Sequence, residues 1–254
     1  LFFHPMTAAS DQPDQPLAMP GANGAARGRS VIPDSRVRTR ERLIRHGTAL
    51  LTEFSFDGTG IERLLREVGV PKGSFYHYFP SKQAFVLAVI DNYVAYFDRK
   101  FDRLLGNASR QPLQRLQDWV AEARMGMARH QFRRGCLVGN LAQELGAHDD
   151  RFRGRLEAVF QSWQGRVRGC LADAVAAGQL SADADPAMLA EFFWIGWEGA
   201  LMRAKLTRDP GPIDVFARQF FAMLPAAAPS GGSAPGAGPR GATSPGARAR
   251  RPGR

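Results

Sequence analysis

The pattern of apolar positions is helical through most of the chain. Between about residue 35 and residue 224, apolar residues recur at intervals of three and four, and no segment alternates convincingly as a strand. Glycine, proline and capping residues, among them the predicted N-caps Ser81 and Asp185, divide this part into helices. They are predicted at 35–54, 59–68, 71–79, 82–105, 112–130, 136–145, 149–177, 186–207 and 213–224. The pattern predicts an all-α fold of about nine helices.

Both ends of the chain lack this periodicity. Residues 1–34 are rich in Pro, Gly, Ala and Gln, and residues 225–254 in Pro, Gly, Ala, Ser and Arg, so both segments are predicted to be disordered. Met6 follows the initial Leu1 closely, and we expect residues 1–5 to lie before the natural start.

Residues 59–82 have the layout of a helix-turn-helix. Thr59 and Glu62 have the spacing of a capping box, and Gly69 suits the end of the first helix. Pro71 suits the start of a second, short helix that Pro80 ends. The first helix has one apolar face, made of Ile61, Leu64, Leu65 and Val68.

The second helix of this motif is predicted to present polar groups outward. Phe75 and Phe79 are four residues apart and should pack inward. Lys72, Ser74, Tyr76 and His77 are left on other faces. Two short helices with donors on the second are typical of a reader of the DNA major groove.

Charge supports an anionic partner. The formal net charge is +10, and residues 35–82 hold nine Lys and Arg against five Asp and Glu, a net of +4. Basic residues at a helix start oppose the helix dipole, so phosphate contact explains them better than helix stability. They are Arg36, Arg38, Arg40, Arg42 and Arg45. Solvated arginines on a disordered arm are the alternative.

Cysteine usage and hydropathy exclude several classes of protein. Two cysteines are too few for a disulfide framework, and no CxxC or histidine cluster suggests a metal site. No apolar run is long enough to span a bilayer, and since the first residues contain no long apolar run we expect no signal peptide. We expect a cytoplasmic protein that needs no cofactor, metal or membrane.

The segment VPKGSFYHYFPSK at 70–82, behind a capped helix and a basic first helix, resembles the TetR family of bacterial regulators. The resemblance implies a DNA-binding domain at 35–82 and a ligand-binding and dimerisation domain at 83–224. It also implies a homodimer on double-stranded DNA with a palindromic operator, a small-molecule effector and no enzymatic activity.

The same resemblance assigns the residues that contact DNA. Lys72, Gly73 and Ser74 match the start of the recognition helix, nearest the base edges. Tyr76, Tyr78 and Lys82 match positions that commonly contact phosphate. Thr59 could add a phosphate contact at the start of its helix, where the helix dipole favours anions. His77, Arg36 and Arg38 complete the expected DNA-binding set. Instead of contacting DNA, His77 and Tyr78 could pack against neighbouring helices, and Lys82 could be a solvated charge.

Residues 126–147 and 193–206 resemble the branch of the family that controls acrylate use and senses electrophiles. Cys136 follows Arg133 and Arg134 and opens a predicted helix, so we expect a lowered thiol pKa and addition to activated alkenes. A buried, unreactive cysteine is the alternative. Cys170 is assigned to the core.

Other sensor candidates lie on neighbouring helices. Lys205 could pair a carboxylate or approach the cysteine, and Glu198, on an apolar helix, needs a partner such as Arg203 or Lys205. Pocket or plain core is expected for Trp119, Met127, Trp163, Trp194 and Trp197. Dimer interface or intrachain core is expected for Gly196, Gly199, Ala200, Phe192, Phe193, Phe216, Phe220 and Phe221.

Three further functions remain open from the sequence. The regulator could bind a non-covalent apolar or acidic ligand. It could be a DNA-architectural protein without a ligand. It could be an enzyme that uses Cys136 with His130 or His148, although no orienting residue or oxyanion motif accompanies them.

Overall fold

The computed structural model describes residues 34–54, 56 and 60–227. This part of the chain contains nine α-helices and one 3₁₀ turn, which confirms the all-α prediction. The predictions of disorder at 1–33 and 228–254 lie outside the described residues. The elements are α1 (Asp34–Glu53), α2 (Ile61–Val68), η1 (Lys72–Ser74), α3 (Phe75–Tyr78), α4 (Lys82–Leu104), α5 (Pro112–Arg129), α6 (Leu137–Leu145), α7 (Asp150–Ala176), α8 (Pro186–Thr207) and α9 (Gly211–Met223).

Side-chain caps fix several helix starts where the sequence placed them. Ser81 accepts a hydrogen bond of 3.0 Å from the amide of Ala84 at the start of α4. Asp185 accepts bonds of 2.9 and 3.1 Å from the first amides of α8, and Pro186 follows it. These caps satisfy amides that have no partner inside the helix.

The start of α2 differs from the prediction. Its N-cap is Gly60, with no side-chain hydrogen bond, and Thr59 lies outside the described residues. The predicted capping box therefore lies partly outside the described residues; within them, the carboxylate of Glu62 binds Lys72.

The start of α9 and the end of the chain also differ from the prediction. The helix α9 begins at Gly211 and not at residue 213. Pro212 is compatible with the first turn, because a backbone N–H at that position has no partner within the helix. Pro225 accepts a bond of 2.9 Å from the amide of Ser181, and Ala226 bridges to Leu180. The tail predicted from residue 225 is therefore ordered at its first two residues.

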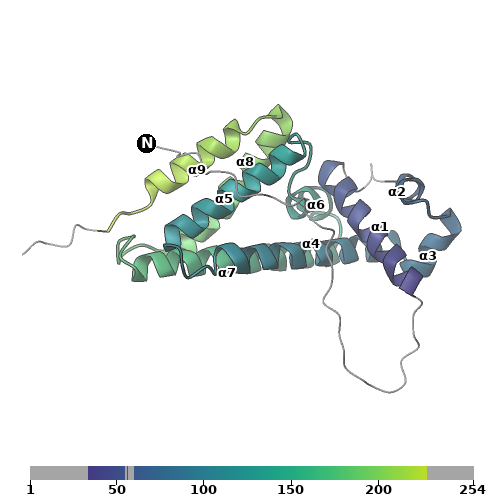
Figure 1. The fold of residues 1–254 in the computed structure, drawn as a ribbon, viewed down its shortest axis with the longest axis horizontal. Coiled ribbons are helices and arrows are strands. Elements are labelled where there is room, and N and C mark those ends of the chain that lie inside the picture. The colour runs from purple at the N-terminus through teal and green to yellow at the C-terminus, as the bar shows by residue number, and fades with distance from the viewer. Residues whose placement is uncertain (1–33, 55, 57–59, 228–254) are drawn as a thin grey trace, which may run out of the picture. The chain divides into compact units, whose positions relative to one another are not determined.

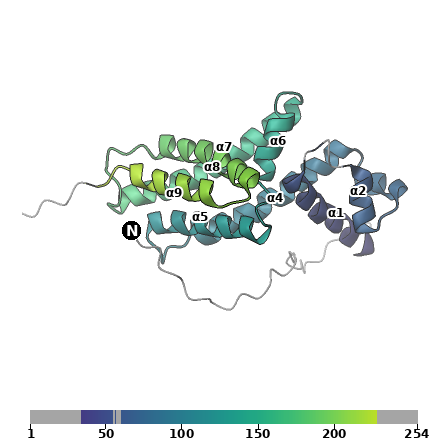
Figure 2. The same cartoon turned by 90° about the horizontal axis from the view of Figure 1, so that it is seen from above.

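The helix α4 leads from the motif of α2 and α3 into the group formed by α5 to α9 (Figure 1). In that group α7 packs against α5, α6 and α8, and α9 packs on α8, an arrangement that Figure 2 shows from above. One cluster of buried apolar side chains joins these helices. None of the described helices combines the length and apolar character that crossing a membrane requires.

Candidate functional site

The recognition segment η1–α3 is anchored by aromatic packing. Phe75 and Phe79 are fully buried, and their rings contact each other and Phe85 of α4 at centroid distances of 5.0–5.6 Å. Gly69 ends α2 with a φ of 68°, a left-handed conformation that glycine adopts without strain. The predicted inward packing is confirmed, and it fixes which side of the segment faces solvent.

The outward side of this segment is polar. Lys72, Gly73, Tyr76 and His77 are exposed, and Ser74 is half-buried. Tyr76 is 63% exposed, so its ring and hydroxyl are accessible from solvent. A Cβ placed on Gly73 would meet nothing, so the backbone there is open to close approach. We call these five residues the recognition surface.

An ion pair occupies one end of the recognition surface. The ammonium of Lys72 donates a hydrogen bond of 2.5 Å to the carboxylate of Glu62, and both side chains are exposed. This bond and the opposite charges raise the pKa of Lys72 and lower that of Glu62. A phosphate or guanine that binds Lys72 would compete with this carboxylate for the ammonium.

The remaining residues predicted to contact DNA differ in their exposure and in the contacts that they make within the chain. Lys82 donates to the carbonyl of Phe56 at 2.7 Å and lies 3.9 Å from the centre of that ring, so here it holds the loop before α2. Tyr78 is half-buried against the core, while Arg36 and Arg38 are exposed on α1. Phosphate contact by these residues remains a prediction.

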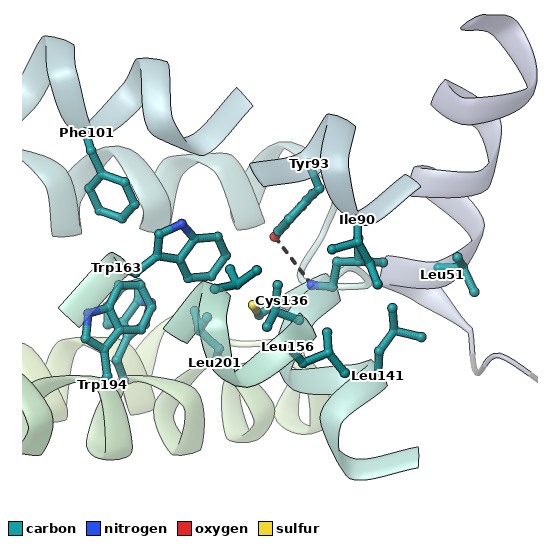
Figure 3. Close-up of a cluster of buried hydrophobic side chains, with 14 of the residues drawn as sticks. Leu51, Ile90, Tyr93, Phe101, Cys136, Leu141, Leu156, Trp163, Trp194 and Leu201 are labelled. Atoms are coloured by element: carbon teal, nitrogen blue, oxygen red, sulfur yellow. Dashed lines mark hydrogen bonds between the residues drawn. The ribbon is translucent and has the colours of Figure 1, made fainter. Parts of the chain in front are cut away.

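Cys136 is the N-cap of α6 and lies in a buried cluster (Figure 3). Its Sγ accepts a bond of 3.5 Å from the amide of Gly139. The carboxyl group of Glu198 lies against the same glycine, since a Cβ placed on Gly139 would overlap the Glu198 Oε2 and lie 3.7 Å from the Cys136 Cβ. The hydroxyl of Tyr93, from α4, accepts a bond of 3.4 Å from the amide of Leu137. The helix start, a phenol and a carboxylate therefore surround one thiol.

The expected lowering of the Cys136 pKa is wrong. Burial, and next the negative charge of Glu198, raise the pKa of this thiol well above its usual value. The cations that prompted the expectation, Arg133 and Arg134, lie 3.9 and 4.0 Å from the carboxylate of Glu53 in α1. At neutral pH the thiol is protonated, and its reaction requires a proton acceptor. The core assignment of Cys170 is confirmed by burial.

Glu198 faces the start of α6. Its Oε1 is enclosed without a hydrogen-bond partner among the described residues, and a Cβ added to Gly139 would overlap Oε2. Burial raises the pKa of Glu198 to about 7, and the hydrogen bond with Cys136 lowers it in part. The predicted pairing with Arg203 or Lys205 is wrong, because in the described part of the chain only Cys136 perturbs this carboxyl besides burial.

The predicted pocket residues meet in one aromatic core. The rings of Trp163 and Trp194 stack at 5.3 Å, and those of Trp119 and Trp197 lie 5.0 Å apart. All four indoles are buried, as is Met127. The Nε1 atoms of Trp163 and Trp194 are enclosed without a hydrogen-bond partner among the described residues. Each such donor costs about 1–3 kcal/mol unless something binds it.

The carbonyl oxygen of Thr52, near the end of α1, accepts hydrogen bonds from residues at the start of α6 and in α8. It accepts hydrogen bonds from the amide of Gly135 at 3.0 Å, the amide group of Asn140 at 3.1 Å and the ammonium of Lys205 at 3.1 Å. Burial lowers the pKa of Lys205. Sequence reasoning missed Thr52, Asn140, Gly139 and Tyr93, because no local pattern marks a contact between distant helices.

The helix α8 has an exposed apolar stripe. Its large residues are 44–74% exposed and are spaced by three, four or seven positions, at Met188, Phe192, Ile195, Met202 and Leu206. Gly199 continues this face with open space around it. Phe193, Phe220 and Ala200 are instead buried within the chain, and a Cβ on Gly196 would overlap the ring of Phe216. Only part of the predicted interface set therefore faces outward.

Comparison with known families agrees with this geometry. Residues 43–89 match the family "Bacterial regulatory proteins, tetR family". Residues 112–220 match the family "Tetracyclin repressor-like, C-terminal domain". The two matches cover the helix-turn-helix with its flanking helices and the helical group around Cys136.

Individual relatives are also similar over most of the chain. Transcriptional regulator AcuR of Cereibacter sphaeroides is 47% identical over 207 residues, which cover 82% of this chain and 94% of that protein. A crystal structure of regulatory protein TetR from Rhodobacter sphaeroides superposes with a TM-score of 0.71 at 49% identity, covering 73% of this chain and 98% of that one. The reduced form of Escherichia coli NemR, named a repressor, has a TM-score of 0.66 at 25% identity, covering 74% and 99%. The chain belongs to the TetR family of DNA-binding transcriptional regulators.

Proposed function

We propose that this regulator is a repressor that leaves its operator when a small activated alkene, of the class to which acrylate belongs, adds to Cys136. The observation that carries the proposal is the position of this thiol. Cys136 directly follows Gly135, whose amide binds the Thr52 carbonyl in α1. A group added to the buried sulfur displaces the start of α6, and the hydrogen bonds at Thr52 transmit that displacement to the DNA-binding helices.

On the DNA side, the recognition surface supplies donors for base edges. A short helix reads few base pairs, so we propose a homodimer on a palindrome with half-sites about 34–36 Å apart or a multiple of it. The exposed stripe of α8 is the proposed contact between the two copies. Phosphate contacts are assigned to Arg36, Arg38, Tyr78 and Lys82. Since bacterial DNA lies in the cytoplasm, the protein is expected to act there.

The test is DNA binding by the full chain. Fluorescence anisotropy with DNA from upstream of its own gene should show saturable binding that weakens steeply with salt. Methyl acrylate should release the DNA from the wild-type protein, and Cys136→Ser should blunt this release. Cys170→Ser serves as the matched control and should respond like the wild type. Normal release from the Cys136→Ser variant would contradict covalent sensing.

A non-covalent ligand is the second candidate. The unpaired indole N–H groups of Trp163 and Trp194 favour it, because a bound carbonyl or carboxylate oxygen would satisfy them. Undiminished release of the Cys136→Ser variant by acrylate would support this candidate. Cysteine-dependent catalysis has less support, since the family consists of regulators.

A further inference from the structure

We propose that Glu198 accepts the thiol proton of Cys136 when the sulfur adds to an uncharged α,β-unsaturated carbonyl compound. The proposal rests on the proposed sensing role of Cys136 and names the proton acceptor and the ligand class of that site. The reactive form of cysteine is the thiolate, and this thiol is protonated at rest. A neighbouring base must therefore take the proton.

The surroundings of Cys136 leave one suitable base among the described residues. Tyr93, from α4, keeps its own proton because burial raises its pKa well above the usual value. Lys205, farther along α8, donates its hydrogen bond to Thr52. Arg133 and Arg134 face Glu53. Glu198 and Cys136 both lie against Gly139, since a Cβ placed on Gly139 would overlap the Glu198 Oε2 and lie 3.7 Å from the Cys136 Cβ. The Oε1 of Glu198 has no hydrogen-bond partner among the described residues.

The packing of Glu198 holds it in place for this transfer. Its Oε2 lies against Gly139, where any other residue's Cβ would overlap it. Gly139 also donates its amide to the Cys136 sulfur. The first turn of α6 thus holds both the thiol and the carboxylate, which is the arrangement that a nucleophile and its base require.

The addition balances without a further reagent. The sulfur electron pair forms a bond to the β-carbon of the alkene, while the thiol proton moves to Glu198. The π electrons of the C=C bond move toward the carbonyl group and form an enolate. Glu198 then returns the proton to the α-carbon. The product is a thioether, and no group leaves.

Charge selects the class of ligand. A free acid would bring a second carboxylate beside Glu198, whose Oε1 is already buried without a hydrogen-bond partner among the described residues. Like charges in a buried site repel strongly, and burial penalises each of them. Esters, amides, aldehydes and ketones avoid this cost. The site therefore favours an uncharged activated alkene over the acrylate anion.

The test follows the alkylation rate of Cys136 by intact-mass spectrometry from pH 5.5 to pH 9, in the full chain with Cys170→Ala as background. With methyl acrylate, the rate should rise with pH and level off above the pKa of Glu198, about 7. Glu198→Gln should react about a hundredfold more slowly at pH 7, with a rate that keeps rising to pH 9. Glu198→Asp, which keeps a base, should fall between them. Glu191→Gln, an exposed change on the same helix, is the matched control.

Three results would overturn the proposal. The first is a Glu198→Gln variant that reacts as fast as the background protein or faster, since Glu198 would then act on the thiol only by raising its pKa. The second is an alkylation rate of the Cys170→Ala background protein that does not level off near pH 7. This outcome can be tested without any change at Glu198. The third is equal reactivity of acrylate and methyl acrylate, which removes the selection by charge.

Simultaneous DNA anisotropy separates this proposal from the proposed function. Glu198-dependent alkylation without DNA release would leave the proton acceptor standing and refute release by the adduct. DNA release without an adduct at Cys136 would refute the proton acceptor and leave a ligand-released repressor.

Discussion

The ammonium of Lys205, in α8, donates a hydrogen bond of 3.1 Å to the carbonyl of Thr52, in α1. This bond joins a helix of the family's C-terminal domain to the first helix of the DNA-binding part. The backbone of Gly135 and the side chain of Asn140 bind the same oxygen. Two connections therefore join the residues around Cys136 to the DNA-binding helices. One is the covalent chain through α4, and the other is the set of hydrogen bonds to the Thr52 carbonyl in α1.

Loss of the Lys205 contact should weaken the coupling between adduct and DNA. We expect Lys205→Met to require more methyl acrylate for half-release, or to release incompletely, while Cys136 is alkylated as before. One lost hydrogen bond should lower stability by about 1 kcal/mol, since Gly135 and Asn140 still satisfy the carbonyl. Anisotropy and intact mass measured on the same samples check this. Arg203→Met, an exposed change on the same helix, is the control. Unchanged coupling in Lys205→Met would mean that α4 alone transmits the signal.

Glu198 should impose a pH dependence on stability. Its pKa in the folded chain is about 7, raised from 4.5, so the folded state binds more protons than the unfolded state between these values. The contribution of Glu198 to stability is therefore lost as pH rises through this window, by about 3 kcal/mol at most. Glu198→Gln should match the wild type near pH 4.5 and be more stable at pH 8. Urea unfolding across this range measures the difference, and parallel curves for the two proteins would rule the effect out.

The pair of Lys72 and Glu62 should tune operator affinity in opposite directions. Lys72→Ala should weaken specific binding about tenfold to a hundredfold, the effect of losing one base contact. Glu62→Gln should tighten binding about two- to fivefold, because no carboxylate then competes with the DNA for the ammonium of Lys72. Anisotropy at several salt concentrations measures both. Arg218→Ala removes a positive charge from an exposed position of α9 and controls for the change in net charge. Equal losses in Lys72→Ala and Arg218→Ala would indicate a nonspecific charge effect.

The exposed stripe of α8 should hold the dimer together. Ile195 is 68% exposed at the middle of the stripe, and Ile195→Glu places a charge in the proposed contact. We expect this variant to be monomeric by sedimentation velocity and to bind palindromic DNA about a hundredfold or more weakly, since each half-site then binds alone. Met125→Glu, on a residue of α5 that is 53% exposed, should remain dimeric. A dimeric Ile195→Glu variant would place the interface elsewhere.

Local features were predictable from the sequence. The caps Ser81 and Asp185 act within three residues, and the inward side of Phe75 and Phe79 follows from their spacing, so both were assigned correctly. The aromatic core was also expected from residue type. These assignments need only periodicity and the chemistry of neighbouring residues.

Features that depend on distant helices were not predictable. Arg133 and Arg134 precede Cys136 in sequence, yet the fold directs them to Glu53, and Glu198 brings a negative charge to the thiol from another helix. The predicted thiol pKa therefore had the wrong direction. The outward face of α8 likewise depends on where α9 packs, which left Phe193 inside and Ile195 outside.

The most direct measurement of the central claim is a single titration with two readouts. Operator anisotropy and intact mass are recorded together as methyl acrylate is added to the wild-type protein and to Cys136→Ser. The account predicts that the fraction of released DNA follows the fraction of Cys136 adduct in the wild type, and that Cys136→Ser stays bound. Release that precedes the adduct, or release from Cys136→Ser at the same concentration, would contradict it.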